Sequence, residues 1–214
     1  MSRKEIYEIE RRAFDEFLIP PLILMENAGR EIALESRRML STLRRKEIVV
    51  LAGRGNNGGD GMVAARYLHC WGFPVSVFIC FDPSMTKEPS FTNYRIVFKM
   101  GIPCESFGEE KIKQKIVSSG LVIDALFGIG LSRPVEAPEA NAIEIVNNAK
   151  IKVLSVDIPS GIDADSGDVL GYAIKADITV TFGFAKKGLY INEGKRYAGK
   201  IKVVDIGYPP EIYM

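Results

Sequence analysis

The sequence predicts one α/β domain, a three-layer αβα sandwich in which helices cover both faces of a doubly wound, mostly parallel, Rossmann-like sheet. Short apolar runs rich in Val and Ile alternate with helix-like stretches along the chain. This alternation is typical of parallel strands that are buried on both faces. A length of 214 residues suits one full core, and no repeat or linker divides residues 1–214.

The elements follow from local composition. Helices are expected over residues 2–17 and 21–43, and the second begins at a proline, which the first helical turn tolerates. Strands are expected where five to seven apolar or β-branched residues run together, namely 48–52, 75–81, 121–125, 152–156, 178–182 and 200–205. Further helices are expected between them, at 62–68, 91–100, 109–118 and 138–149.

The segment Gly53–Gly61 lies between the first strand and the next helix. Gly53, Gly55 and Gly58 fit the dinucleotide pattern G-x-G-x-x-G in the strand-to-helix context that it requires. Glycines allow a phosphate to approach the backbone, and the first N–H groups of the helix point toward such an anion. The pattern also fits a tight turn without a ligand. The chain has no P-loop pattern, which argues against a P-loop kinase or ATPase.

Two further strand ends carry aspartates. Asp124 opens the loop that reaches Pro134, and Asp157 opens the loop that reaches Gly167. Taken singly, such an aspartate is more typical of a helix cap or a turn. Ligands of doubly wound folds bind outside the carboxyl ends of the strands. Three polar, glycine-bearing loops at that edge therefore favour a site.

Composition excludes several classes of partner. The net charge of +1 leaves no overall electrostatic signature for nucleic acid. No apolar run approaches the length of a membrane span, and residues 1–5 do not resemble a signal peptide. The 3 cysteines have no metal-binding spacing, and an odd number argues against a disulfide framework, so we expect a cytoplasmic protein. His69, the only histidine, is expected on a helix surface, which argues against histidine-based triads.

These residues resemble the NAD(P)H-hydrate epimerases, or YjeF N-terminal-domain proteins. The matching stretches occur in the family's order and spacing and are Met25–Arg30, Gly53–Gly61, Asp124–Pro134, Val156–Gly167 and Ala176–Phe182. Ile129 stands where the family commonly has threonine, and residues 136–138 replace a glycine-bearing turn. Because the chain ends at Met214, we expect no fused dehydratase domain.

The resemblance implies epimerisation of the R and S forms of hydrated NADH and NADPH (NADHX and NADPHX) at nicotinamide C6. Implied substrate contacts are Asn56, Asn57, Gly58, Gly59, Asp60, Gly128, Ile129, Gly130, Leu131, Ser132, Arg133, Pro134 and Asp157. It also implies one potassium ion per subunit, held by Asn57, Asp124 and Ser160. The implied partners are a second copy, with residues 2–43 near the interface, and a separate ADP- or ATP-dependent dehydratase.

The chemistry of the residues agrees with these implications. A hard monovalent cation prefers oxygen ligands, and it would offset the repulsion between Asp60 or Asp124 and a pyrophosphate. Epimerisation moves a proton to or from the C6 hydroxyl, which one carboxyl group can do, and Asp157 is the expected catalytic residue. Lys186 and Lys187 are expected to be solvated surface lysines.

Two alternatives stay open at this point. An NAD-dependent oxidoreductase would explain the glycine spacing and would use Asp82 on a ribose. The absence of a Tyr-x-x-x-Lys pair and the unexplained run Asn56–Asp60 argue against it. A non-catalytic nucleotide-binding or scaffold domain would be expected to lose aspartates, whereas this chain keeps Asp124 and Asp157.

Overall fold

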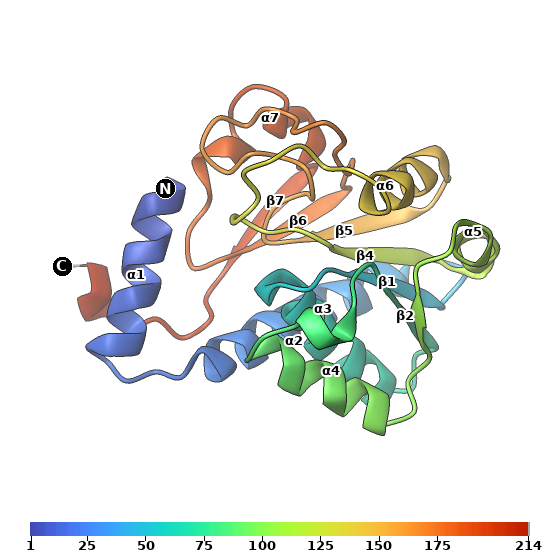
Figure 1. Ribbon diagram of the computed structural model, residues 1–214, viewed down its shortest axis with the longest axis horizontal. Helices are drawn as coiled ribbons and strands as arrows, with labels where there is room; N and C mark the ends of the chain where they lie inside the picture. Colours follow the sequence, from blue (N-terminus) through green and yellow to red (C-terminus); the bar gives the residue numbers. More distant parts are fainter. Residues whose placement is uncertain (214) are drawn as a thin grey trace.

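A sheet of seven parallel strands, in the order β3-β2-β1-β4-β5-β6-β7, forms the centre of the computed structural model, which describes residues 1–213 (Figure 1). The strands are β1 (Ile48–Ala52), β2 (Val75–Ile79), β3 (Cys104–Ser106), β4 (Leu121–Ala125), β5 (Lys152–Val156), β6 (Ile178–Phe182) and β7 (Lys200–Val204). The helices are α1 (Arg3–Asp15), α2 (Pro21–Ser41), α3 (Asn56–Cys70), α4 (Ser90–Lys99), α5 (Glu109–Ser118), α6 (Glu139–Asn148) and α7 (Gly194–Tyr197). Single 3-10 turns are η1 (Pro83–Met85), η2 (Lys187–Leu189) and η3 (Pro210–Tyr213).

Alternate strand residues build two hydrophobic cores. Val50 of β1 packs with residues of α2, α3 and α4, whereas its neighbours Val49 and Leu51 pack with residues of α5 and α6. These two groups of helices lie on opposite faces of the sheet (Figure 1). Each central strand is therefore apolar on both faces, as expected for a doubly wound parallel sheet.

The strand order places a topological switch at β1. This strand pairs with β2 on one side and with β4 on the other, and every strand pair is parallel. The carboxyl ends of all strands therefore meet at one edge, where the loops after β1, β4, β5 and β6 gather. Ligands of this fold class bind at such an edge.

The predicted fold class and the strands with apolar runs are confirmed. The structure adds β3, whose sequence Cys104-Glu105-Ser106 has no apolar run, and the four-residue α7. It also starts α3 at Asn56 rather than near Met62. Six of the nine residues of the glycine-rich segment, Asn56–Gly61, therefore belong to a helix.

Helix α1 packs against the carboxyl edge of the sheet. A capping box between Ser2 and Glu5 starts it, and Ile6, Ile9 and Ala13 are its buried residues. Arg3 ties it to the opposite loops, donating to the Leu131 carbonyl at 2.9 Å and to a carboxylate oxygen of Asp163 at 2.7 Å. Figure 1 shows α1 at the end of the molecule, beside the C-terminal segment.

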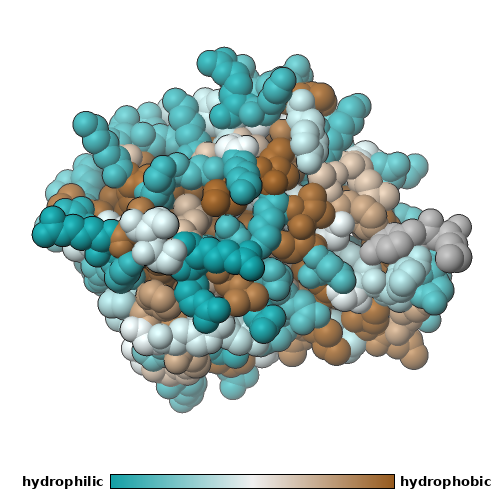
Figure 2. Space-filling model, turned by 180° about the vertical axis from the view of Figure 1, so that it is seen from behind, coloured by the Kyte–Doolittle hydropathy of each residue, from teal (hydrophilic) through white to brown (hydrophobic). Residues whose placement is uncertain are grey.

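The outer surface is mixed in character. On the face opposite to that of Figure 1, hydrophilic residues interleave with hydrophobic ones (Figure 2). No helix in residues 1–213 is long and apolar enough to cross a membrane.

Candidate functional site

A cavity of about 640 Å³ opens at the carboxyl edge of the sheet. Its walls come from α1, from the loops after β1, β2 and β4, and from single residues after β5 and at the end of β6. A second, smaller cavity of about 70 Å³ lies beneath α1. The two cavities share the residues Glu10, Asn56, Asp60, Asp157 and Phe182. A single region therefore combines an open volume of ligand size with a small inner recess.

Most of the residues predicted to contact substrate line the larger cavity. These are Asn56, Asn57, Asp60, Gly128, Ile129, Gly130, Leu131, Ser132, Arg133 and Asp157. Gly58, Gly59 and Pro134 are not part of that lining as far as the described residues go. Tyr7, Glu10 and Arg54 also line it and were not predicted. Contact with a substrate stays a prediction for all of these residues.

The glycines at the start of α3 have different tasks. A Cβ on Gly53 would lie 1.8 Å from the Leu126 carbonyl oxygen, and a Cβ on Gly58 would lie 1.8 Å from that of Gly53. A Cβ on Gly59 would lie 2.6 Å from the Met25 side chain, so Gly59 serves the packing of α3 on α2. Gly55 alone in this turn has open space on its Cβ side, and it lines the cavity. Gly55, rather than Gly59, is therefore the position open to a ligand.

Asp157 lies where β5 ends, with a left-handed backbone conformation (φ 64°) that is rare for a residue with a side chain. Its Oδ1 atom accepts hydrogen bonds from the Thr181 hydroxyl and the Phe182 N–H, each at 3.1 Å, and from the Lys186 ammonium. Its Oδ2 atom accepts none from residues 1–213. The three donors fix the carboxylate and leave one oxygen without a protein partner at the cavity wall.

Lys186 corrects an expectation. Its side chain is only 2% exposed, and it pairs with Asp157 and donates to the Phe182 carbonyl at 3.1 Å. Lys187 is exposed, as expected. The two lysines look alike in sequence, but the first points inward because the chain turns back at η2 beneath α1. A buried lysine needs such a carboxylate partner.

Two more carboxyl groups face this ion pair. Burial, and after it the charge of Asp157, raises the pKa of Glu10 to about 7, while Lys186 opposes the rise. The same causes, with Glu10 added, raise the pKa of Asp60 well above its ordinary value. Neither carboxyl group makes a hydrogen bond or an ion pair within the described chain. Glu10 could have been found in the sequence, because it is adjacent to Ile9 on the buried side of an amphipathic helix.

The three predicted cation ligands converge on one backbone segment. Ser160 donates its hydroxyl to Asp124 at 2.5 Å and accepts the Phe127 N–H at 2.9 Å, and Asn57 donates to the Phe127 carbonyl at 3.0 Å. Asp124 is fully buried and also accepts the Ser155 hydroxyl at 2.7 Å. Burial raises the pKa of Asp124, although its hydrogen bonds oppose this, and no lysine or arginine of the described chain pairs with it.

Asp82 and His69 are surface residues. The carboxylate of Asp82 accepts the Ser84 N–H at 2.9 Å and thereby caps η1 at the cavity rim. His69 is exposed at the far end of α3, as predicted. Asp82 therefore already has a local structural role, which removes the main residue-level support for an oxidoreductase.

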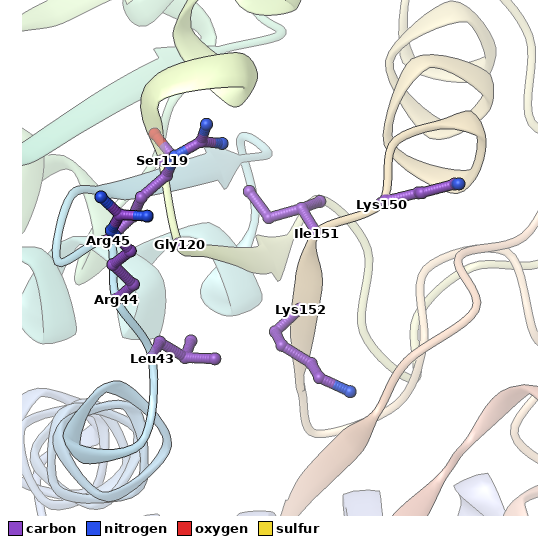
Figure 3. Close-up of a pocket in the computed structure, with 8 residues that line it drawn as sticks. All are labelled: Leu43, Arg44, Arg45, Ser119, Gly120, Lys150, Ile151 and Lys152. Carbon is purple, nitrogen blue, oxygen red and sulfur yellow. The ribbon is translucent and has the colours of Figure 1, made fainter.

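A larger hollow of about 820 Å³ lies at the other end of the sheet, where β1, β4 and β5 begin. Arg44, Arg45, Lys150 and Lys152 line it, and Figure 3 shows the two lysines extending away from the arginines. Lys152 is neutralised by Asp177 at 2.6 Å. These cations do not converge on a common point, so this hollow offers no arrangement for catalysis.

The chain has clear relatives. The family described as YjeF-related protein N-terminus matches residues 21–188. The chain is 40% identical to the bifunctional NAD(P)H-hydrate repair enzyme Nnr of Thermofilum pendens, over 96% of this chain and 39% of that enzyme. It is 39% identical to the NAD(P)H-hydrate epimerase of Limosilactobacillus fermentum, over 96% of this chain and 98% of that enzyme.

The crystal structure of the yeast protein YNL200c superposes with a TM-score of 0.82 at 25% identity, over 99% of this chain and 90% of that one. This match covers the fold from α1 to the last strand. The family match across residues 21–188 includes the strand-end loops after β1, β4 and β5. The chain belongs to the YjeF-related protein N-terminus family.

Proposed function

We propose that the chain is an isomerase that interconverts the R and S epimers of hydrated NADH and NADPH at C6 of the nicotinamide ring. Relatives named for NAD(P)H-hydrate repair support this substrate, because the identity of about 40% extends over nearly the whole chain. The observation that carries the proposal is the buried ion pair of Asp157 with Lys186, in which Asp157 lines a cavity of dinucleotide size.

The pyrophosphate of the substrate would lie at the start of α3. The N–H groups of the first helical turn lack partners within the helix and attract anions. Gly55 leaves the approach open, and the exposed Arg54 and Arg133 line the same cavity. The two positive charges of Arg54 and Arg133 would balance the two negative charges of the pyrophosphate. The reacting ring would then extend toward Asp157, away from solvent.

Asp157 would handle the proton at the C6 oxygen. Departure of water or opening of the ring makes C6 planar and lets the hydroxyl return from either face. The Oδ2 atom is the one without a protein partner, while Oδ1 is held by Thr181, Phe182 and Lys186. Such a fixed orientation is what a general acid and base requires.

A potassium ion would be held by Asn57, Asp124 and Ser160. The donor set fits a hard monovalent cation, since it consists of amide, carboxylate and hydroxyl oxygens. The fully buried Asp124 has no cationic partner in the described chain, so a bound cation would compensate its charge. When bound, the ion would lower the electrostatic cost of placing a pyrophosphate beside these carboxylates.

A test of the cation site needs no activity. A crystal soaked in rubidium chloride should show an anomalous peak among Asn57, Asp124 and Ser160, and an Asp124→Asn crystal should lose it. A site without a peak at high rubidium concentration would contradict the proposal.

The partners follow from the same reaction. The Thermofilum relative is named a bifunctional repair enzyme, and this chain matches only 39% of its length. We therefore propose that a separate ADP- or ATP-dependent dehydratase consumes the epimer that this chain produces. A homodimer and a cytoplasmic location are part of the same proposal. Size-exclusion chromatography with light scattering would test the dimer.

The decisive experiment is chiral separation of the NADHX epimers over time, with and without the protein. A pure epimer should equilibrate faster with protein than in buffer. Equal rates at saturating substrate, with a folded protein and potassium present, would overturn the proposed function.

A further inference from the structure

Helix α1 brings one face of its side chains to the cavity. Arg3, Tyr7 and Glu10 are spaced i, i+4 and i+7 and so project from the same side of the helix. Arg3 bonds to the loop after β4 and to Asp163, which fixes the height of the helix over the site. Tyr7 and Glu10 line the larger cavity, and Glu10 also lines the inner recess.

Glu10 differs from every other acid of this segment. The carboxylate of Glu5 accepts the Ser2 N–H at 2.7 Å, Glu8 pairs with Arg11 at 2.7 Å, and Glu16 pairs with Arg12 at 3.0 Å. Glu10 has no such partner among residues 1–213, although it is less exposed than any of these three. A partly buried carboxyl group without a hydrogen bond is unfavourable, so its position at the wall of both cavities points to a ligand.

The surroundings of Glu10 and Asp157 are opposite in character. Asp157 receives three hydrogen bonds on one oxygen, one of them from an ammonium group. Glu10 lines the inner recess together with Asp157, Lys186 and Asp60, and it lines the larger cavity together with Tyr7 of its own helix. Burial and the charge of Asp157 raise its pKa to about 7, so a large part of Glu10 keeps its proton at neutral pH. Two carboxyl groups in such different surroundings can divide the roles of acid and base between them.

We propose that Glu10 is a second catalytic residue, a general acid that works with Asp157 as general base on the C6 hydroxyl of the substrate. The inference rests on the proposed epimerase function and deepens it. The two carboxyl groups enter the cavity from different walls, α1 and the end of β5, so each serves one side of the ring.

The step balances as follows. The carboxyl proton of Glu10 passes to the C6 hydroxyl oxygen while the ring nitrogen lone pair forms an N=C6 double bond. The C6–O bond breaks, and water leaves. A water molecule then adds to C6 from the side of Asp157, which takes one proton from it, and the N=C6 electron pair returns to nitrogen. The proton on Asp157 returns to Glu10 through solvent before the next turnover in the same direction.

The test compares Glu10→Gln with Glu8→Gln. The control removes a charge from the same helix at an exposed position that does not line the cavity. Epimer interconversion is followed by chiral separation from pH 5 to 9, and ADP-ribose affinity is measured by calorimetry. We expect Glu10→Gln to lower kcat by about 10²–10⁴-fold with little change in ADP-ribose affinity. The change of rate with pH near 7, which reflects the titration of Glu10, should be absent in the Glu10→Gln variant.

The outcomes separate the two proposals. Wild-type protein without epimerase activity overturns the proposed function and this inference together. Active wild type with a Glu10→Gln variant within about threefold of its kcat overturns the role of Glu10 alone, because a general acid contributes far more. Glu10→Asp keeps the acid one methylene shorter, so it should recover part of the rate and restore the pH limb. A Glu10→Asp variant as slow as Glu10→Gln, with the same flat profile, would contradict acid catalysis.

Discussion

The two ends of the sheet differ in where their charges lie. At the carboxyl end the paired side chains of Asp157 and Lys186 are 11% and 2% exposed, and Asp157 lines the smaller of the two large hollows. At the amino end the equivalent ion pair, Lys152 with Asp177, keeps 54% and 34% of its side chains exposed. Burying charge costs free energy that only precise pairing offsets. The chemistry of its walls, rather than the size of a hollow, therefore identifies a site.

The largest effect should come from breaking the buried pair. Asp157→Asn should lower the epimerisation rate by about 10²–10⁴-fold, because the general base is lost. Asp177→Asn, which breaks the exposed pair at the other end, should leave the rate within about twofold. Rates are measured by chiral separation of NADHX epimers.

Loss of folding would confuse this result, because Asp157→Asn leaves the Lys186 ammonium buried without a counter-ion. The double variant Asp157→Asn, Lys186→Met removes that charge and should recover stability without recovering activity. Near wild-type activity in either folded variant would remove Asp157 from the mechanism.

The next effect concerns the backbone of the carboxyl end. Gly53→Ala and Gly58→Ala should each lower the free energy of unfolding by at least about 3 kcal/mol, because the new Cβ meets a backbone oxygen that cannot move away. Both contacts would be 1.8 Å. Gly55→Ala should stay within about 1 kcal/mol of wild type, since nothing lies within 4 Å of its Cβ. Urea unfolding measures all three, and equal losses would contradict the division of tasks among these glycines.

Gly55→Val tests ligand access at the same turn. The backbone there (φ −90°, ψ −170°) is open to any residue, so the fold should survive. The branched side chain should occupy the approach to the first turn of α3 and weaken ADP-ribose binding by about tenfold or more, or about 1.4 kcal/mol. Calorimetry gives the affinity and thermal melting gives the control. Unchanged affinity in a folded variant would move the pyrophosphate elsewhere.

The contributions of Glu10 at the carboxyl end and of Glu47 at the amino end to the stability of the fold should change with pH in opposite directions. The pKa of Glu10 rises from 4.5 to about 7 on folding, so the folded state holds an extra proton between these values. Its contribution to stability is complete below pH 4.5 and is lost as the pH rises through 7. At the amino end, burial acts to raise the pKa of Glu47, but hydrogen bonds from Lys115 and Ser118 outweigh it and lower this pKa. The contribution of Glu47 to stability therefore appears as the pH rises.

Urea unfolding from pH 4 to 8 separates these signs. The stability difference between wild type and Glu10→Gln should fall with rising pH, and that for Glu47→Gln should grow by a smaller amount, because Glu47 is mostly solvated. If both stability differences changed in the same direction with pH, the raised pKa of Glu10 would be contradicted.

The smallest effect is expected at the larger hollow. Arg44→Ala, Arg45→Ala and Lys150→Ala should each leave the epimerisation rate and the ADP-ribose affinity within about twofold, and stability within about 0.5 kcal/mol. All three residues are exposed there. A tenfold change in any of them would show that the amino end of the sheet contributes to ligand binding.

The fold could be predicted from the sequence because each central strand is an apolar run and most connections contain glycine or proline. It missed β3, since a three-residue edge strand has no pattern of its own. Asn57 and Asp157 could be placed at the carboxyl edge because Asp157 follows β5 directly and Asn57 lies in the glycine-rich segment after β1. Lys186 could not be assigned in the same way, since burial of a charged side chain depends on which distant segment covers it. The packing of Gly59 could not be predicted for that reason too, because its neighbour Met25 comes from another helix.

The three cysteine thiols have a practical consequence. Burial raises the pKa of Cys80 to about 12 and that of Cys104 to about 11, so both remain protonated and unreactive at neutral pH. Cys70 is exposed at the last residue of α3, and that helix begins at the cavity. With 15 residues at about 1.5 Å each, the helix places this thiol roughly 20 Å from the cavity. Maleimide dyes should therefore label the natural sequence at one point, giving a fluorescent reporter of ligand binding without any substitution.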